Sequence, residues 1–312
     1  MDVKYQSFIR ESIRKIKEFC NKPYNTLDML RWAILGGLVF ITIYGLTPLN
    51  VTNDRWLLNG YVELDASQHY AGWLAFRQSS WSFPIGKIDG LGGTFVTYTD
   101  SIPWVAIFFK TFSKILPETF QYFGIYIFTC LVFQAVSSGL LISLFSKNKL
   151  YTDLGVVLFC FSPIMLERAF SHSALASHWL IIYMLYYYFK SRRNKYMDWK
   201  SIIIPIIAIG IHPYFLPMVF GIMFANLVEL YIINHRTIIR STVYLLSSLF
   251  LSIVAGYLIG ALGTSSAIGG DDYGFFSMNL NAIINPFSCG KIVWSKFLPV
   301  LPLTAHIERH LR

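Results

Sequence analysis

Seven runs of apolar residues, nearly free of charge, are the feature that most constrains the fold of this chain. Folded as helices, the longer runs can cross the ~30 Å hydrocarbon core of a bilayer. Charged residues make up only 14% of the 312 positions, whereas a soluble domain carries about 25%. We therefore predict an all-α, polytopic membrane protein with about seven transmembrane helices rather than a soluble globule or a disordered chain. The runs lie at 32–48, 120–145, 150–166, 174–189, 201–212, 214–233 and 241–263.

The segment 201–233 is the ambiguous part of this prediction. It is too long for one ordinary span, and it is interrupted at His212-Pro213-Tyr214 and again at Pro217. Proline removes a helix hydrogen bond and restricts the residue before it. We interpret the segment as a tight hairpin with a short first arm, with a single kinked helix as the alternative.

The distribution of positive charge predicts the orientation. If the N-terminus lies inside, the inner segments 1–31, 147–149, 190–200 and 235–240 hold 16 of the 26 Lys and Arg residues. This excess is what the positive-inside rule requires. The prediction is a cytoplasmic, amphipathic segment at 1–31, a transmembrane module at 32–263 and a periplasmic C-terminal segment at 264–312.

Other features of the composition restrict the partners. The amphipathic pattern at 5–22 suits an anionic lipid surface, so membrane lipids are expected partners. We interpret the net charge of +9 as a topology signal, and we expect no nucleic acid to bind. The four cysteines have no metal or redox spacing and are interpreted as small buried hydrophobes. They are Cys20, Cys130, Cys160 and Cys289.

The long external segment 49–119 is expected to hold two amphipathic helices at the membrane interface. The first starts at Asp65 and carries Tyr70, Trp73, Leu74 and Phe76. The second starts near Asp100 and carries Ile102, Val105, Phe108, Phe109 and Phe112, with Lys110 able to extend its ammonium to water.

Acidic residues in this segment are the first candidates for chemistry. Glu63 and Asp65, two residues apart, can share a cation, or one can accept a proton while the other orients it. Asp65 and Asp100 also fit helix N-caps, with Gln68 reaching back to the first cap. The two interpretations are compatible, because a capping carboxylate can still face a cavity.

A basic pair stands at the outer end of the third and fourth runs. Arg168 and His172 are four residues apart and share a helical face, while His178 lies six residues further on. An arginine beside a histidine can hold a phosphate, the arginine in bidentate fashion. The alternative is an interfacial Glu167–Arg168 ion pair with structural histidines.

These candidates share one side of the membrane under the predicted topology. The paired Asp271 and Asp272 are interpreted as a solvated turn. Few ionisable residues lie deep in the runs, where a transporter would place them. This asymmetry favours chemistry at the interface over conduction. The set is Glu63, Asp65, His69, Asp100, Arg168, His172, His212 and Asn279.

Several short segments resemble a family of uncharacterised bacterial multi-pass proteins with the architecture of the C-type (GT-C) superfamily of membrane glycosyltransferases. Such enzymes begin with an N-in span, followed by a large external loop with two interface helices and an acidic ExD or DxD signature. Glu63-Leu-Asp65 stands at the place of that signature. The matching segments are 65–73, 98–103, Arg168–His172, His178-Trp179, His212–Tyr214 and 277–280, within about residues 30–300.

The resemblance implies a function and roles. The donor would be a sugar on a polyprenyl phosphate, and the acceptor a surface glycan or lipid-linked saccharide at the outer face of the bacterial inner membrane. Asp65 would be the general base, assisted by Glu63 or Asp100. Arg168 and His172 would hold the donor phosphate, and His69, His178, His212 and Asn279 would complete the substrate site. A divalent cation, Mg²⁺ or Mn²⁺, would bind at Glu63 and Asp65 if a metal takes part.

Two alternatives to this enzyme stay open. One is a carrier or flippase of lipid-linked saccharides, which would need polar groups near the middle of the membrane, such as Gln134. The other is a non-catalytic membrane protein or a fragment. The resemblance implies truncation, because such enzymes continue with further spans or an external domain, and a truncated chain can lack activity.

Overall fold

The computed structural model describes residues 23–58, 64–90 and 93–263, and this part of the chain is all-helical, as predicted. The amphipathic segment 5–22, the acidic Glu63, the turn at 271–272 and the C-terminal segment 264–312 lie outside the described residues. The N-terminal half contains α2 (Thr26–Tyr44), η1 (Thr47–Leu49), α3 (Arg55–Leu58), α4 (Leu64–Gln78), η2 (Val96–Thr99), α5 (Pro103–Lys110) and α6 (Phe123–Ser143). The rest comprises α7 (Lys149–Cys160), α8 (Pro163–Ser171), η3 (Ser173–Ala176), α9 (Trp179–Asn194), η4 (Trp199–Ile202), α10 (Ile203–Ile209), α11 (Phe215–Ile233), η5 (His235–Thr237) and α12 (Ile238–Ile259).

Four of the described helices are long and apolar enough to cross a membrane, which is compatible with a membrane protein. They are α2, α6, α11 and the segment His235–Ile259 that contains α12. The pair α7 and α8, bent by 42° between Cys160 and Pro163, makes a fifth if it counts as one span. Helix α9 has only 16 residues and α10 only seven. The described helices thus provide four or five clear spans instead of the seven expected.

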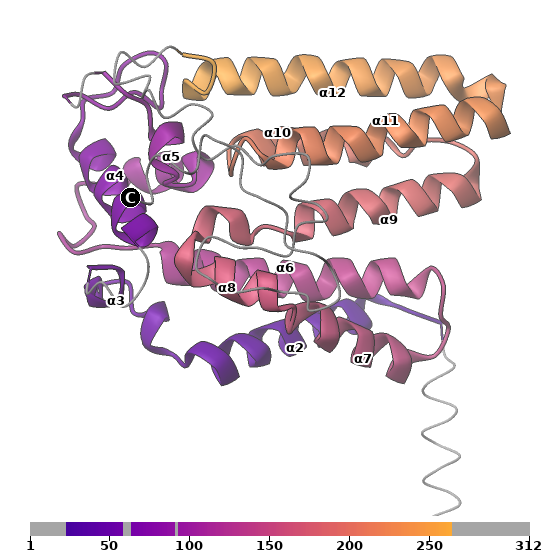
Figure 1. Cartoon of the computed structure of the whole chain (residues 1–312), viewed down its shortest axis with the longest axis horizontal. Coiled ribbons are helices and arrows are strands. Elements are labelled where there is room, and N and C mark those ends of the chain that lie inside the picture. Colours follow the sequence, from indigo (N-terminus) through magenta and orange to yellow (C-terminus); the bar gives the residue numbers. More distant parts are fainter. Residues whose placement is uncertain (1–22, 59–63, 91–92, 264–312) are drawn as a thin grey trace, which may run out of the picture. The chain divides into compact units, whose positions relative to one another are not determined.

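Helix α6 occupies the middle of one half of the bundle, between α2, α7 and α9 (Figure 1). Glycines let α2 and α6 approach closely. A Cβ on Gly36 would lie 2.5 Å from the Leu131 carbonyl oxygen, and a Cβ on Gly139 would lie 2.3 Å from the Trp32 ring. Small residues at helix contacts are typical of membrane bundles, where backbone packing replaces the hydrophobic effect as the driving force.

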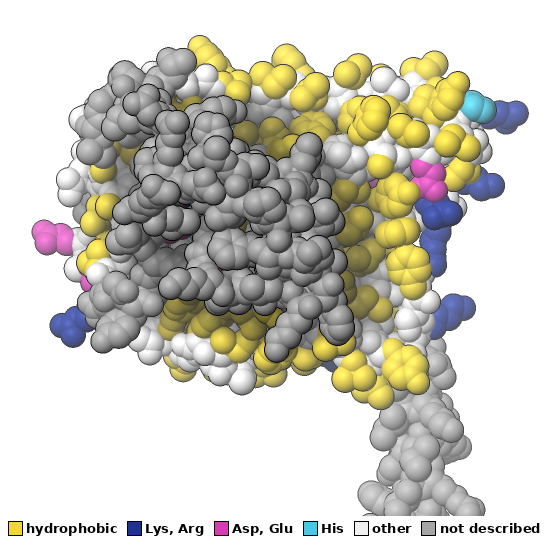
Figure 2. Space-filling view, in the orientation of Figure 1, with side chains coloured by type: hydrophobic (Ala, Val, Ile, Leu, Met, Phe, Trp, Pro, Cys, Tyr) yellow, Lys and Arg dark blue, Asp and Glu magenta, His cyan; other side chains and the backbone are white. Residues whose placement is uncertain are grey.

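Large apolar side chains cover much of the outside of the helices (Figure 2). On α7, Leu158 is 73% exposed, and on α12, Ile239 is 78% exposed. A soluble monomer rarely exposes extended apolar patches, so these faces fit a lipid environment. Cys130 and Cys160 are buried and free, which confirms the hydrophobic role predicted for these two cysteines.

The segment 201–233 is broken between α10 and α11, and the two helices pack against each other as the arms of a hairpin. At the break, the Trp104 backbone N–H donates to the Gly210 carbonyl (2.8 Å), and the Trp104 indole N–H donates to the Ile206 carbonyl (3.1 Å). A Cβ on Gly210 would collide with this indole. The single kinked helix is therefore wrong. The short first arm expected at 201–212 corresponds to η4 and α10, a short apolar helical segment at Trp199–Ile209.

The segment between α2 and α6 forms α3, α4, η2 and α5 at one end of the bundle (Figure 1). Two helices were expected here, and α4 and α5 confirm them. The apolar face of α4 differs from the prediction, because Tyr70, Trp73 and Phe76 are buried inside the protein instead of facing lipid. Lys110, expected to reach water, is only 4% exposed and lies 3.9 Å above the Phe76 ring.

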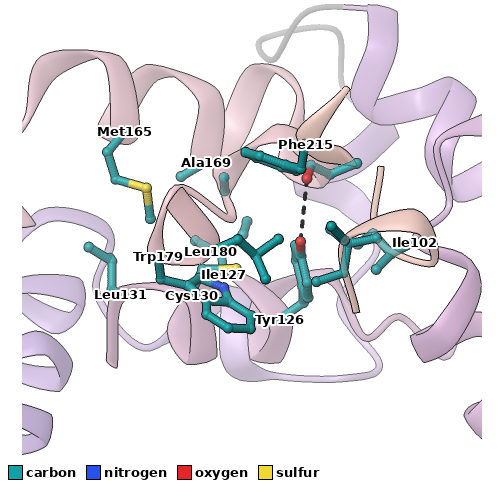
Figure 3. Close-up of a cluster of buried hydrophobic side chains, with 14 of the residues drawn as sticks. Ile102, Tyr126, Ile127, Cys130, Leu131, Met165, Ala169, Trp179, Leu180 and Phe215 are labelled. Atoms are coloured by element: carbon teal, nitrogen blue, oxygen red, sulfur yellow. Dashed lines mark hydrogen bonds between the residues drawn. The ribbon is translucent and has the colours of Figure 1, made fainter. Parts of the chain in front are cut away.

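Buried side chains beneath this end hold the helices together (Figure 3). Tyr126 of α6 is at their centre. Its hydroxyl lies 2.7 Å from Ser177 Oγ and donates to the Ala174 carbonyl at 3.4 Å. The segment after α8 is thereby fixed to α6.

Ionic contacts collect at the other end of the bundle. Lys149 is paired with the buried Asp28 at 2.8 Å, and Arg192 with Glu229 at 3.0 Å. On the face seen in Figure 2, most of the Lys and Arg side chains lie at this end, beside the ends of α9 and α11 and the start of α12. The bundle therefore has a basic end and, opposite it, an end built by the segment between α2 and α6.

Candidate functional site

Five ionisable side chains from four separate segments converge at the end of the bundle that carries α4 and α5. Asp65 and His69 belong to α4, and Asp100 precedes α5. His172 caps the C-terminus of α8, and His212 lies in the turn between α10 and α11. All five were singled out from the sequence. We refer to Asp65, His69, Asp100, His172 and His212 as the histidine–aspartate cluster.

A close helix contact positions the two residues of α4. Asp65 and His69 are four residues apart and share one face of the helix. One turn later, a Cβ on Gly72 would lie 2.3 Å from Thr99 and 2.6 Å from Ser101 Oγ. Ser101 Oγ also donates to the His69 carbonyl at 2.6 Å. The backbone of α4 therefore lies directly against the segment that presents Asp100.

Asp100 is held in an unusual backbone conformation. Asp100 has φ +53° and Ile102 has φ +54°, a left-handed region that costs a non-glycine residue about 1–3 kcal/mol. Between them, the Ser101 carbonyl accepts a hydrogen bond from the buried Tyr122 hydroxyl. The helix α5 has no side-chain cap, so the expected capping role of Asp100 is wrong. Its carboxylate instead faces two histidines.

Contacts link four members of the cluster into a chain. His172 Nδ1 donates to Asp65 Oδ2 at 3.1 Å, and His172 Nε2 lies 3.6 Å from Asp100 Oδ2. His212 Nε2 lies 3.2 Å from Asp100 Oδ1. The Tyr214 backbone N–H donates to His212 Nδ1, so the proton of a neutral His212 is on Nε2 and points at Asp100. Asp65, in the first turn of α4, therefore contacts a histidine of another segment.

His69 completes the cluster from the buried side. Its ring stands edge-on to that of His172, with 4.6 Å between centroids, and its Nδ1 lies 3.3 Å from Ser173 Oγ. Ser173 was not among the predicted residues, although its position next to His172 is the signal that could have indicated it. Neither His69 Nε2 nor His172 Nε2 has a hydrogen-bond partner within the described residues.

Exposure increases across the cluster. The His69 residue is only 1% exposed, and the side chains of His212 and His172 are 6% and 15% exposed. Asp100 is 24% exposed and Asp65 is 46% exposed. Asp65 is therefore the member of the cluster whose side chain is most accessible to solvent.

Burial and charge set the protonation of the inner residues. Burial, and next the neighbouring His172, lower the pKa of His69 to about 4, so His69 is neutral at pH 7. Burial alone would raise the pKa of Asp100, but the hydrogen bond to His212 and the three surrounding histidines together bring this pKa below its usual value. The cluster thus contains a neutral buried imidazole next to an ionised carboxylate.

Arg168 and His178, which were predicted to belong to the site, make none of these contacts. Arg168 is half-buried on α8 and forms no ion pair within the described residues, so the expected Glu167–Arg168 pair is not found there. Burial, and next the positive charge of Arg168, lower the pKa of His178, whose ring centroid lies 6.4 Å from that of Phe215. The predicted Asn279 lies outside the described residues. The predicted metal pair Glu63–Asp65 is likewise only half described, because Glu63 is outside them.

A separate cleft of about 230 Å³ opens near α5. Its lining includes Arg77, Trp81, Lys110 and Lys114 and no member of the histidine–aspartate cluster. Arg77 is occupied by backbone carbonyls, among them those of Ser113 and Leu116. The convergent side chains of the cluster, rather than the volume of this cleft, therefore identify the candidate site.

Comparison with known proteins gives a family match. A family described as "Domain of unknown function (DUF6311)" matches residues 33–309. No curated protein and no solved structure matches the chain. All members of the histidine–aspartate cluster fall within the matched range.

Proposed function

Because the chain belongs to the DUF6311 family, a domain of unknown function, we propose a function from its own site: the protein is a membrane glycosyltransferase. It transfers a sugar from a polyprenyl phosphate to a glycan or lipid-linked acceptor at the periplasmic face of a bacterial inner membrane. The resemblance to C-type glycosyltransferases supports this proposal, as does the position of Asp65.

The observation that carries the proposal is the setting of Asp65. Its carboxylate is 46% exposed, while His172, 15% exposed, donates to its Oδ2 at 3.1 Å. A positioned carboxylate with one oxygen held from behind is suited to take a proton from a hydroxyl. Histidine behind the carboxylate restricts its orientation, and exposure gives an acceptor access.

The proposed reaction is a direct displacement. Asp65 takes the proton of the acceptor hydroxyl while the acceptor oxygen bonds to the anomeric carbon. The bond from that carbon to the phosphate oxygen breaks, and polyprenyl phosphate leaves with the electron pair. The configuration inverts. Arg168, one helical turn before His172 and without an ion pair among the described residues, is the proposed cation for the leaving phosphate.

The proposed topology has seven crossings with the basic end in the cytoplasm. The helices α2 and α12 run toward the end that carries α4 and α5, and α6, α9 and α11 run away from it (Figure 1). Between α6 and α9, the pair α7 and α8 forms one bent passage back. The remaining crossing is the short α10 together with η4. Ser201 and Ile204 of this segment are buried in protein, where non-helical backbone at membrane depth is tolerated. The cluster is then periplasmic.

Sugar transfer by the full-length chain in proteoliposomes tests this function. Donors are a panel of polyprenyl phosphates that carry radiolabelled sugars, and the product is measured as label in the acceptor. We expect Asp65→Asn to reduce transfer by at least 100-fold, since the base is lost. Glu118→Gln is the matched control, because Glu118 is an exposed carboxylate of the same external segment, and it should transfer at the wild-type rate.

Two outcomes would contradict the proposal. Transfer by Asp65→Asn at the wild-type rate removes the assigned base. If the protein moves the intact lipid-linked saccharide across the bilayer and transfers sugar from no donor, it is the carrier and not a glycosyltransferase.

A further inference from the structure

We propose that the histidine–aspartate cluster binds one divalent transition-metal ion of the zinc type through His69 Nε2, His172 Nε2 and Asp100 Oδ2. One ligand atom from each of these three residues can be chosen so that all lie within 4.8 Å of one another. The inference goes beyond sugar transfer, because it concerns what the cluster binds, and it rests on geometry alone.

The first argument is that two nitrogens are buried without a partner. His69 Nε2 and His172 Nε2 have no hydrogen-bond partner among the described residues, although each atom is inaccessible to water. Buried polar atoms are almost always satisfied in proteins, and an exception points to an ion, a water or a function. The 4.6 Å edge-on packing of the two rings brings both imidazoles to one place.

The second argument is that the other atoms of the ligands are already held. His172 Nδ1 faces Asp65 Oδ2 at 3.1 Å, and His69 Nδ1 faces Ser173 Oγ at 3.3 Å. With protons on these Nδ1 atoms, both Nε2 lone pairs are free. Metal-binding histidines almost always donate their second N–H in this way, and a carboxylate is a common acceptor.

Asp100 fits the same pattern. Its Oδ1 is 3.2 Å from His212 Nε2. Because His212 Nδ1 accepts a hydrogen bond from the Tyr214 backbone N–H, the proton of the neutral His212 ring is on Nε2. Its other oxygen, Oδ2, lies 3.6 Å from His172 Nε2. Two ligand atoms each about 2.1 Å from a tetrahedral metal are roughly 3.4 Å apart. The observed separation therefore needs little adjustment to admit an ion between them.

The ligand set selects the class of metal. Two imidazoles and one carboxylate suit zinc and its neighbours, whereas Mg²⁺ prefers oxygen ligands. Three protein ligands leave a fourth position for water or an anionic oxygen, as in zinc sites that bind substrates. This site differs from the Mg²⁺ or Mn²⁺ at Glu63 and Asp65 expected from the sequence, because Asp65 here orients a ligand instead of serving as one.

Metal titration of the purified full-length chain in detergent tests the proposal. After treatment with a chelator, Zn²⁺ affinity is measured by competition with a chromophoric chelator, and Co²⁺ is used as a spectroscopic probe. We expect one high-affinity Zn²⁺ per chain and an intense visible Co²⁺ spectrum of a four- or five-coordinate site. His172→Gln and Asp100→Asn should each weaken binding by at least 100-fold. Asparagine tolerates the left-handed conformation of position 100, so the second variant keeps the local backbone.

Two further variants separate ligands from surroundings. Asp65→Asn removes the carboxylate behind His172 and should weaken Zn²⁺ binding by about 10-fold, the effect of losing an orienting partner. His235→Gln is the control, because His235 is exposed in η5 at the basic end, and it should bind Zn²⁺ as the wild type does. Circular dichroism and size-exclusion profiles of the variants show whether each has folded.

The proposal fails if the wild type binds no Zn²⁺ at micromolar concentration, or if the His172→Gln and Asp100→Asn variants bind it as tightly as the wild type. A weak, octahedral Co²⁺ spectrum of the wild type also overturns it, and this result does not depend on the folding of any variant. The titration contains no sugar donor. A failure of sugar transfer therefore leaves the metal result intact, and a failure of metal binding leaves the transfer assay intact.

Discussion

At the scale of single residues, the candidate site depends on how closely two backbones approach at Gly72. A side chain there would meet Thr99 and Ser101, the residues that precede and follow Asp100. The orientation of Asp100 toward its histidines is thus linked to a glycine on a different helix. A substitution at Gly72 should therefore change both the stability of the protein and the geometry of the site.

Gly72→Ala tests this link. The added Cβ would lie 2.3 Å from Thr99, and overpacking of this kind costs about 1–3 kcal/mol. We expect a lower thermal midpoint in detergent for Gly72→Ala. Gly221→Ala is the matched control, since a Cβ on Gly221 meets nothing within 4 Å and alanine favours the helix. Equal midpoints for the two variants would contradict the close approach.

Lys110 gives a prediction about pH. Burial lowers the pKa of its ammonium to about 8, although Asp89 opposes this effect, whereas the unfolded chain titrates near 10.5. Between these values the unfolded state binds more protons, so stability rises with pH in this window. We expect the thermal midpoint of the wild type, relative to that of Lys110→Met, to increase from about pH 8 to 10.5.

The control for this pH effect is Lys114→Met, because Lys114 is the exposed lysine one turn further on. Relative to this variant, the wild type should show no such rise. A wild-type midpoint that runs parallel to that of Lys110→Met from pH 7 to 10.5 would mean that Lys110 keeps its ordinary titration.

At the scale of elements, helix α5 joins the segment between α2 and α6 to the α10–α11 hairpin. Trp104 makes this contact through its backbone N–H to Gly210 and its indole N–H to Ile206. His212 is two residues beyond Gly210. The same contact therefore fixes one end of the histidine–aspartate cluster.

Trp104→Ala should weaken both the hairpin and the cluster. The indole is half-buried, so its loss is expected to cost about 2–3 kcal/mol, below the 3–5 kcal/mol of a fully buried tryptophan. The thermal midpoint in detergent measures this loss. Trp199→Ala removes an indole that is 53% exposed and should change the midpoint far less. A larger effect at Trp199 than at Trp104 would disprove the fastening role of α5.

Sequence patterns predicted the elements that a local signal defines. The apolar runs at 120–145 and 241–263 correspond to α6 and α12, and Pro213 lies in the break of the hairpin, whereas Pro217 lies in the first turn of α11. A short first arm was expected at 201–212, but the end of its helix was not. Helix α10 ends at Ile209, where Trp104 of another helix packs against Gly210.

At the scale of the whole molecule, the sequence indicated that ionisable residues gather at one end, but not which of them meet. Asp65, Asp100 and His172 converge. Arg168 is not among their contacts, and its positive charge lies near His178. The difference arises from the positions of α4 and α8 relative to each other. Contacts between helices that are far apart in the chain leave no periodic signal in the sequence. The glycines at which the helices approach closely leave no such signal either.

The proposed topology predicts opposite accessibility for the two ends. Glu118→Cys lies in the external segment and Arg236→Cys at the basic end, and both positions are exposed. Each variant is made in a form of the protein that lacks its four native cysteines. In intact cells, a membrane-impermeant maleimide should label Glu118→Cys at once. It should label Arg236→Cys only after permeabilisation, since positive loops stay inside. Labelling of both positions from the same side would refute the seven-crossing arrangement.

The cluster draws its members from positions 65 to 212, and this has a consequence for biogenesis. During synthesis, α4 leaves the ribosome long before the turn that carries His212. Asp100 therefore gains its last partner only after the intervening helices, from α5 to α10, have been made. Assembly of the cluster is thus a late event, completed only when the α10–α11 hairpin packs against Trp104.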